Sequence, residues 1–67
     1  MIILQPFTKK EKQIIELIQK GYSNKYIAEL MGLSYHTIMT HLNSIYSKTD
    51  IPHIYNKRMA LSIFTKY

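Results

Sequence analysis

Five neutral side chains within residues 36–47 are the part of the sequence best suited to contacting another molecule. In a helix, which turns by about 100° per residue, they share one face. They are His36, Met39, Thr40, Asn43 and Ser47. An exposed helix face usually carries lysine and glutamate, so this composition is typical of a contact surface. The alternative is an ordinary exposed face in a sequence with few charges.

Residues for catalysis or metal binding do not form a matching set. His36 and His41 are five positions apart, which is off the i, i+4 spacing that puts two imidazoles on one helix face. The chain has no cysteine, no glycine-rich phosphate loop and no nucleophile with a base to activate it. We therefore expect no enzyme activity, no metal site, no cofactor and no small-molecule ligand. His41 is expected to pack or hydrogen-bond near the second helix, and His53 to be a loop residue.

The charge balance favours an anionic partner. Nine Lys or Arg residues and four Asp or Glu residues give a net charge of +5. The acids lie outside residues 30–49: they are Glu11, Glu16, Glu29 and Asp50. A phosphate backbone can therefore approach that segment without repulsion.

The length of 67 residues predicts one domain, spanning 1–67, with a single core. Without cysteine, stability must come from helix packing or from a partner subunit. The apolar start, residues 1–4 within an arm of residues 1–7, is too short for a membrane span and lacks a signal-peptide pattern. We therefore expect a cytoplasmic protein with no membrane partner.

Three helices are expected in the first two thirds of the chain. Thr8 and Glu11 have the spacing of a capping box, which predicts a helix over about residues 9–20 that Gly21 ends. Ser23 can cap a second helix that ends at Gly32. The expected inward-facing residues of these two helices are Ile14, Ile15, Leu17 and Ile18, then Tyr26, Ile27, Leu30 and Met31.

A tight turn at residues 31–34 leads from the second helix to the third, which Ser34 caps. A short turn containing glycine lets two helices cross steeply, as in a helix-turn-helix. The core-facing stripe of the third helix is expected at Ile38, Leu42 and Ile45. Pro52 interrupts the pattern, and Asn56 can cap a last helix over residues 57–66.

The order of these motifs resembles the LuxR-type helix-turn-helix domain over residues 7–64. The matching residues are Phe7-Thr8-Lys9-Lys10-Glu11, Gly21-Tyr22-Ser23-Asn24-Lys25-Tyr26-Ile27-Ala28, Leu33-Ser34, Thr37-Ile38 and His41. The resemblance implies an all-α, four-helix DNA-binding domain of a bacterial or phage regulator of transcription. Because the chain begins at its own Met1, it resembles the free-standing members, such as the spore-germination regulator of bacilli.

The resemblance also implies two sets of contacts to double-stranded DNA. It places Met39, Thr40 and Asn43 at base edges, on the face that helix geometry also selects. It places Ser23, Asn24, Lys25, Thr37 and Lys48 near phosphates. Asn43 can pair with adenine, and Thr40 and Met39 can touch a thymine methyl, so we expect an A/T-rich half-site. Many family members carry a basic amino acid at the position that Met39 occupies in this chain.

Lys10 is a further phosphate candidate, at the start of the first helix. Together with Lys9 and Lys12 it crowds a helix N-terminus, where the macrodipole disfavours each cation by ~0.3–1 kcal/mol. Flanking phosphates would compensate these charges. The alternative is solvated lysines beside Glu11 and Glu16.

The last helix carries the dimer contact in the family. The candidates are therefore Met59, Ile63, Phe64 and Tyr67. The alternative is simple packing onto the first helix, and the apolar residues 1–4 can cover a core edge or a partner. This region departs from the family, since Thr49 and Asp50 replace its usual Leu-Gly and the last helix arrives about three residues late.

Together these features predict a sequence-specific transcription regulator that places the helix starting near Ser34 in a major groove. We expect a homodimer on half-sites about one helical turn apart. One alternative is a sigma-like module with RNA polymerase as its partner. The other is an adaptor that contacts proteins and no longer binds DNA.

Overall fold

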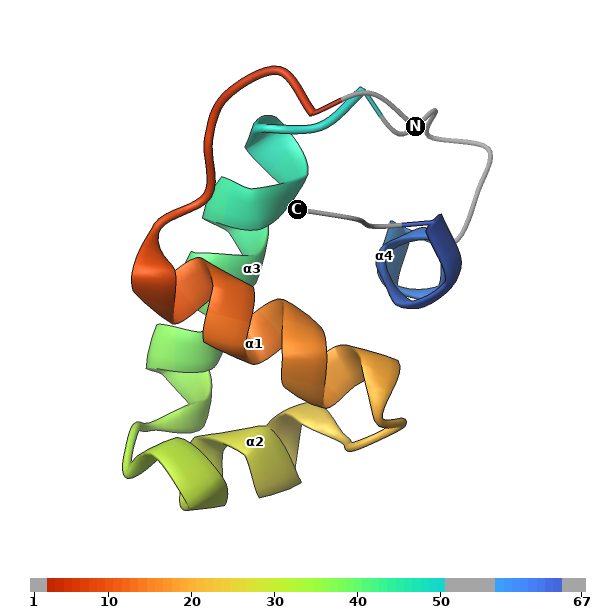
Figure 1. The fold of residues 1–67 in the computed structure, drawn as a ribbon. Coiled ribbons are helices and arrows are strands. Elements are labelled where there is room, and N and C mark those ends of the chain that lie inside the picture. Colours follow the sequence, from red (N-terminus) through yellow and green to blue (C-terminus); the bar gives the residue numbers. More distant parts are fainter. Residues whose placement is uncertain (1–2, 51–56, 65–67) are drawn as a thin grey trace.

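The computed structural model describes the backbone of residues 3–50 and 57–64, with the side chains of 3–50 and 58–61. Within these residues the chain is all-α, as predicted, and forms α1 (Lys9–Gln19), α2 (Asn24–Met31), α3 (Tyr35–Ser47) and α4 (Lys57–Phe64) (Figure 1). None of these helices is long and apolar enough to cross a membrane. Predictions for Pro52, His53 and Asn56 lie outside the described residues.

The first three helices begin where the sequence predicts, because a side-chain hydroxyl accepts a hydrogen bond from a first-turn amide. The Oγ atoms of Ser23 and Ser34 each accept such a bond at 3.1 Å. Thr8 Oγ1 accepts from the Glu11 amide at 3.1 Å, and Glu11 Oε1 accepts from the Thr8 amide at 2.8 Å. This reciprocal pair is the expected capping box, and it satisfies two donors that a helix start leaves open.

Gly21 and Gly32 end the first two helices in the left-handed region, with φ of +87° and +66°. This conformation brings a later amide back to a carbonyl of the last turn. Leu33 N–H donates to the Ala28 carbonyl at 2.9 Å. The turn between α2 and α3 therefore depends on a residue that tolerates positive φ.

We expect Gly32→Ala to lower the free energy of unfolding by about 1 kcal/mol, because an L side chain is strained at this φ. Apart from Gly32 and its two chain neighbours, no described residue comes within 4 Å of the added Cβ, so the cost comes from backbone strain. A thermal melt should show a drop of about 4–8 °C. Gly32→Asn is the matched control and should lose less, because asparagine tolerates the left-handed region. Equal losses for both variants would contradict this reason.

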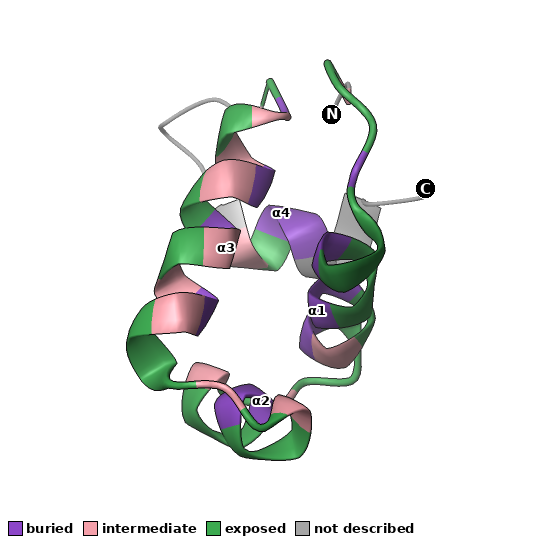
Figure 2. Ribbon diagram, turned by 90° about the vertical axis from the view of Figure 1, so that its left-hand side faces the viewer, coloured by how far each residue is buried: buried purple, intermediate pink, exposed green. Residues whose placement is uncertain are grey.

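The core lies between α1, α2, α3 and α4, and Figure 2 shows buried positions on the inner sides of the helices. The stripe predicted on α3 is confirmed: Ile38, Leu42 and Ile45 are all buried. On α2 the prediction is wrong for Tyr26 and Leu30, which are 45% and 51% exposed. The helix does bury Ile27, as predicted, together with Ala28, and Met31 packs partly buried against the core, so that Tyr26 and Leu30 lie beside the contact line.

The N-terminal arm and α4 close the core from two other sides. Leu4 N–H donates to the Lys48 carbonyl at 2.7 Å, and Ile3 forms an isolated bridge with Thr49 beyond the end of α3. Ile3 packs against the core, whereas Leu4 is 60% exposed. On α4, Leu61 is buried, and its carbonyl accepts from Gln19 Nε2 of α1 at 3.5 Å.

Candidate nucleic-acid interface

The side of α3 that points away from the core carries the predicted base-facing residues. His36, Thr40, Asn43 and Ser47 are exposed, and Met39 is half-buried and packs against the core. In Figure 2 the exposed side of α3 faces away from α1. The structure therefore presents four of these five side chains to solvent together, along one helix face.

Two hydroxyls on this face donate back to their own helix. Thr40 Oγ1 donates to the His36 carbonyl at 3.1 Å, and Ser47 Oγ donates to the Ser44 carbonyl at 2.7 Å. Their hydroxyl protons are thus used inside the helix, a common arrangement for these residues. Thr40 is left with an oxygen lone pair and a methyl group to offer to a ligand.

Asn43 lies on the same face and, unlike Thr40 and Ser47, does not donate back to its own helix. Its side chain is exposed and makes no hydrogen bond to the part of the chain that the structure describes. The amide therefore keeps both a donor and an acceptor. This pair can match the N6 amino group and N7 of adenine at once.

Met39 and Asn24 are held by contacts within the protein. Asn24 Nδ2 lies 3.5 Å from Met39 Sδ, as a donor to the sulfur. Asn24 Oδ1 accepts from the guanidinium of Arg58, which also donates to the Tyr22 carbonyl. Arg58 was missed by the sequence analysis, because its partners lie 34 and 36 residues away and leave no local pattern.

The other phosphate candidates on α2 and α3 lie near the helix starts. Ser23 Oγ is exposed but occupied as the cap of α2, and Thr37 Oγ1 shares a hydrogen bond of 2.9 Å with Ser34 Oγ. Lys25 is exposed and forms no ion pair with any described residue. Among these candidates, its cation is the most readily available to an anion.

Lys48 has a partner that the sequence analysis did not assign. Its Nζ lies 2.7 Å from Glu11 Oε1, with 16% and 3% of the two side chains exposed. Ser44 Oγ donates to Glu11 Oε2 at 2.7 Å. This ion pair joins the start of α1 to the end of α3. The expected contact of Lys48 with phosphate stays a prediction.

The environment of Glu11 favours its charged form. Burial alone would raise the pKa of this carboxyl. The hydrogen bonds from Lys48, the Thr8 amide and Ser44, together with the positive charge of Lys48, outweigh burial and lower the pKa from 4.5 to about 2. Glu11 is therefore ionised at neutral pH, and the contact with Lys48 is a true ion pair.

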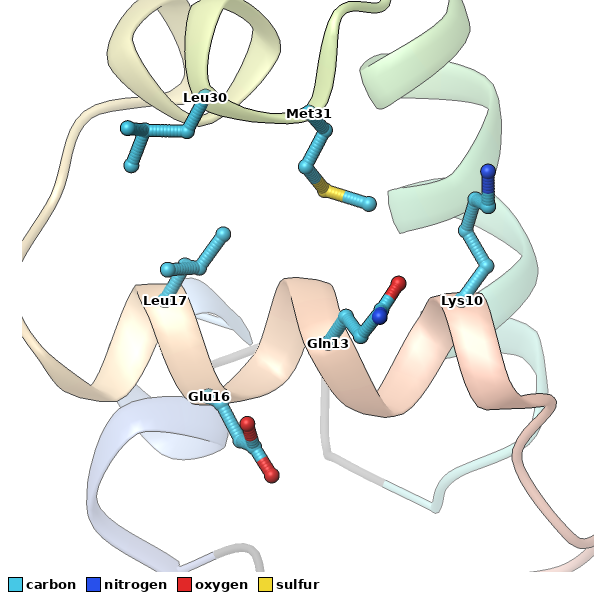
Figure 3. A pocket seen from close by; sticks show the side chains of 6 residues that line it. All are labelled: Lys10, Gln13, Glu16, Leu17, Leu30 and Met31. Carbon is cyan, nitrogen blue, oxygen red and sulfur yellow. The ribbon is translucent and has the colours of Figure 1, made fainter.

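Lys10 lies at a separate place, in a groove of about 490 Å³ between α1 and α2. The groove is lined by Lys10, Gln13, Glu16, Leu17, Leu30 and Met31. In Figure 3 Leu17 points across the groove toward Leu30, and Glu16 points away from it. None of the predicted base-facing residues lines this groove.

The dimer candidates are only partly within the described residues. Met59 is 59% exposed on α4. The side chains of Ile63 and Phe64, and the whole of Tyr67, lie outside the described part. Packing of α4 onto α1 through Leu61, the alternative reason for its apolar face, is present. A dimer contact through Met59 stays a prediction.

The sequence matches one protein family and a curated relative. Residues 5–57 match the family described as "Bacterial regulatory proteins, luxR family". The "Monoamine regulon transcriptional regulator" of Klebsiella aerogenes is 41% identical over 44 residues, which are 66% of this chain. The match spans 19% of that relative's length. No solved structure gives a significant match.

Proposed function

The chain belongs to the luxR family of bacterial regulatory proteins, and on this premise we propose that it is a sequence-specific DNA-binding regulator of transcription. In this proposal α3 enters the major groove of double-stranded DNA. One observation carries it: α3 buries one stripe in the core and leaves the opposite, uncharged face exposed, and the Asn43 amide on that face makes no hydrogen bond to a described residue.

The size and charge of α3 suit a major groove. Its 13 residues form a rod of about 20 Å, and a helix fits a groove about 12 Å wide. Residues 30–49 contain no acid that would repel phosphates. Glu11 lies close by at the start of α1, but its charge is neutralised by Lys48.

The chemistry of the exposed face favours A/T base pairs. Asn43 would pair with adenine, and the methyl group of Thr40 would touch that of thymine. One such face makes few base contacts, so tight binding requires two copies. We propose a two-fold dimer through α4, with half-sites about one helical turn apart.

The experiment that tests this function is selection of bound sequences from a random pool of duplex DNA by the full chain. We expect an A/T-rich motif, repeated with inverted symmetry, and binding that weakens as salt rises. Absence of salt-dependent binding to any duplex would refute the proposal and favour the adaptor. Enrichment of RNA polymerase on the chain, without a selected motif, would favour the sigma-like role.

Lys25→Ala is expected to weaken binding to selected and random duplexes alike, by about 3–10-fold, because a phosphate contact carries no sequence information. The plot of log affinity against log salt should become shallower by about one unit. Lys20→Ala removes the same charge at an exposed position at the end of α1 and serves as the control. A changed base preference in Lys25→Ala would contradict the phosphate role.

A further inference from the structure

We propose that Arg58 of α4 is a positioning residue for Met39 on the DNA-facing helix, acting through the side chain of Asn24. The proposal rests on the DNA-binding function above. It goes beyond that function because it makes the recognition face of α3 depend on a helix that does not itself carry base-reading residues.

The first link joins α4 to the start of α2. The guanidinium of Arg58 donates to two acceptors that are close in the chain, the Tyr22 carbonyl and Asn24 Oδ1. A planar group with several fixed donors holds two such acceptors in one geometry, which a lysine ammonium does less well. Arg58 therefore fixes both the backbone before α2 and the first side chain of α2.

The second link joins Asn24 to α3. An asparagine side chain has one oxygen end and one nitrogen end. Because Arg58 occupies the oxygen, the nitrogen is directed to the other side, where Asn24 Nδ2 meets Met39 Sδ at 3.5 Å. Without Arg58 the amide could turn over and offer its oxygen to the sulfur, which is not a donor.

These two links restrict the conformation of the Met39 side chain. Methionine is unbranched and flexible, so it adapts its conformation easily unless a contact restricts it. Here the contact with Asn24 and packing against the core keep Met39 half-buried, next to Thr40 on the exposed face. The base that Met39 meets should therefore depend on Arg58.

Arg58 also acts on α3 near the far end of the helix. Burial raises the pKa of Tyr46, and the positive charge of Arg58 opposes that shift. The start of α4 thus lies close enough to influence both α2 and α3. The link from α4 toward α3 is carried by the hydrogen bonds of Arg58 to Asn24 and the Tyr22 carbonyl.

Three variants of the full chain separate positioning from simple stabilisation. Arg58→Ala removes both links. Asn24→Asp keeps an oxygen for Arg58 but removes the amide donor to Met39. Gln19→Ala is the control, because it removes a different hydrogen bond to α4, the one that Gln19 donates to the Leu61 carbonyl.

The first readout needs no DNA. In methyl NMR of the free protein, with the Met39 signal assigned by Met39→Leu, Arg58→Ala and Asn24→Asp should both shift the Met39 methyl resonance. Gln19→Ala should leave it in place. If Asn24→Asp folds and the Met39 signal does not move, the link from Asn24 to Met39 is overturned, even where Arg58→Ala fails to fold.

The second readout is specificity, measured as the affinity for the selected duplex divided by that for a random duplex. We expect this ratio to fall by about 3–10-fold in Arg58→Ala and Asn24→Asp, and not in Gln19→Ala. In a chain that already carries Met39→Ala, the further substitution Arg58→Ala should change this ratio little. Equal loss for both duplexes would reduce Arg58 to a structural residue and overturn the proposal. If the unchanged chain binds neither duplex, the DNA-binding function fails, while the NMR result still decides the positioning of Met39.

Discussion

Glu11→Ala is expected to lower the free energy of unfolding by about 3 kcal/mol, measured by urea denaturation at pH 7. The substitution leaves Lys48 only 16% exposed and without its carboxylate, and removes the acceptor for Ser44. A domain of this size has a total stability of roughly 3–10 kcal/mol. The variant should therefore keep about 0–7 kcal/mol, and at the lower end of this range it is at its unfolding midpoint. Glu16→Ala, an exposed position on the same helix, should change stability by less than about 0.5 kcal/mol.

Lowering the pH should reduce the free energy of unfolding in the same way as Glu11→Ala does, because protonation also removes the charge of Glu11. The pKa of Glu11 is about 2 in the folded chain and 4.5 in the reference state. A lowered pKa means that this contribution, about 3 kcal/mol, is fully present above pH 4.5 and is lost as the pH falls toward 2. Glu11→Gln removes the titrating group, so its stability should depend much less on pH in this window. Identical acid profiles for the two proteins would rule out Glu11 as the group responsible.

Glu11 also shows how far the sequence could predict this fold. Its spacing from Thr8 predicted the capping box, because a helix start is decided by residues three positions apart. Its hydrogen bonds with Ser44 and Lys48 span 33 and 37 residues. Those depend on how α3 crosses α1, which no local pattern encodes. The resemblance to the LuxR-type domain placed Lys48 near phosphates, and no pattern in the sequence identified Glu11 as its partner.

The prediction for α2 was wrong at two positions, Tyr26 and Leu30, for a related reason. Helical spacing placed Tyr26 and Leu30 on its apolar face, but spacing does not say how wide a contact the helix makes. Tyr26 instead packs edge-on against Tyr22, with ring centroids 5.0 Å apart. The stripe on α3 was predicted correctly because its three apolar residues are spaced i, i+4 and i+7, and the residues on the opposite side of the helix are mostly polar.

Asn43→Ala is expected to weaken binding to the selected duplex by about 10–100-fold per half-site, because a two-point contact with a base is worth about 1–3 kcal/mol. Affinity for a random duplex should change by less than about threefold, since phosphate contacts supply most of that binding. Thermal stability should be unchanged, because Asn43 is exposed and makes no hydrogen bond to the described residues. Titrations with both duplexes, at one salt concentration, measure the difference.

A repeat of the selection with Asn43→Asp tests the chemistry of the contact as well as its strength. Aspartate only accepts hydrogen bonds, so it loses the match to adenine and can accept from the amino group of cytosine. The preference for adenine should disappear at one position in each half-site and should persist at the others. If Asn43→Asp instead selects the original motif with uniformly lower affinity, the loss comes from repulsion between the new carboxylate and the phosphates, and Asn43 does not read a base. Base reading would then have to come from other residues of α3.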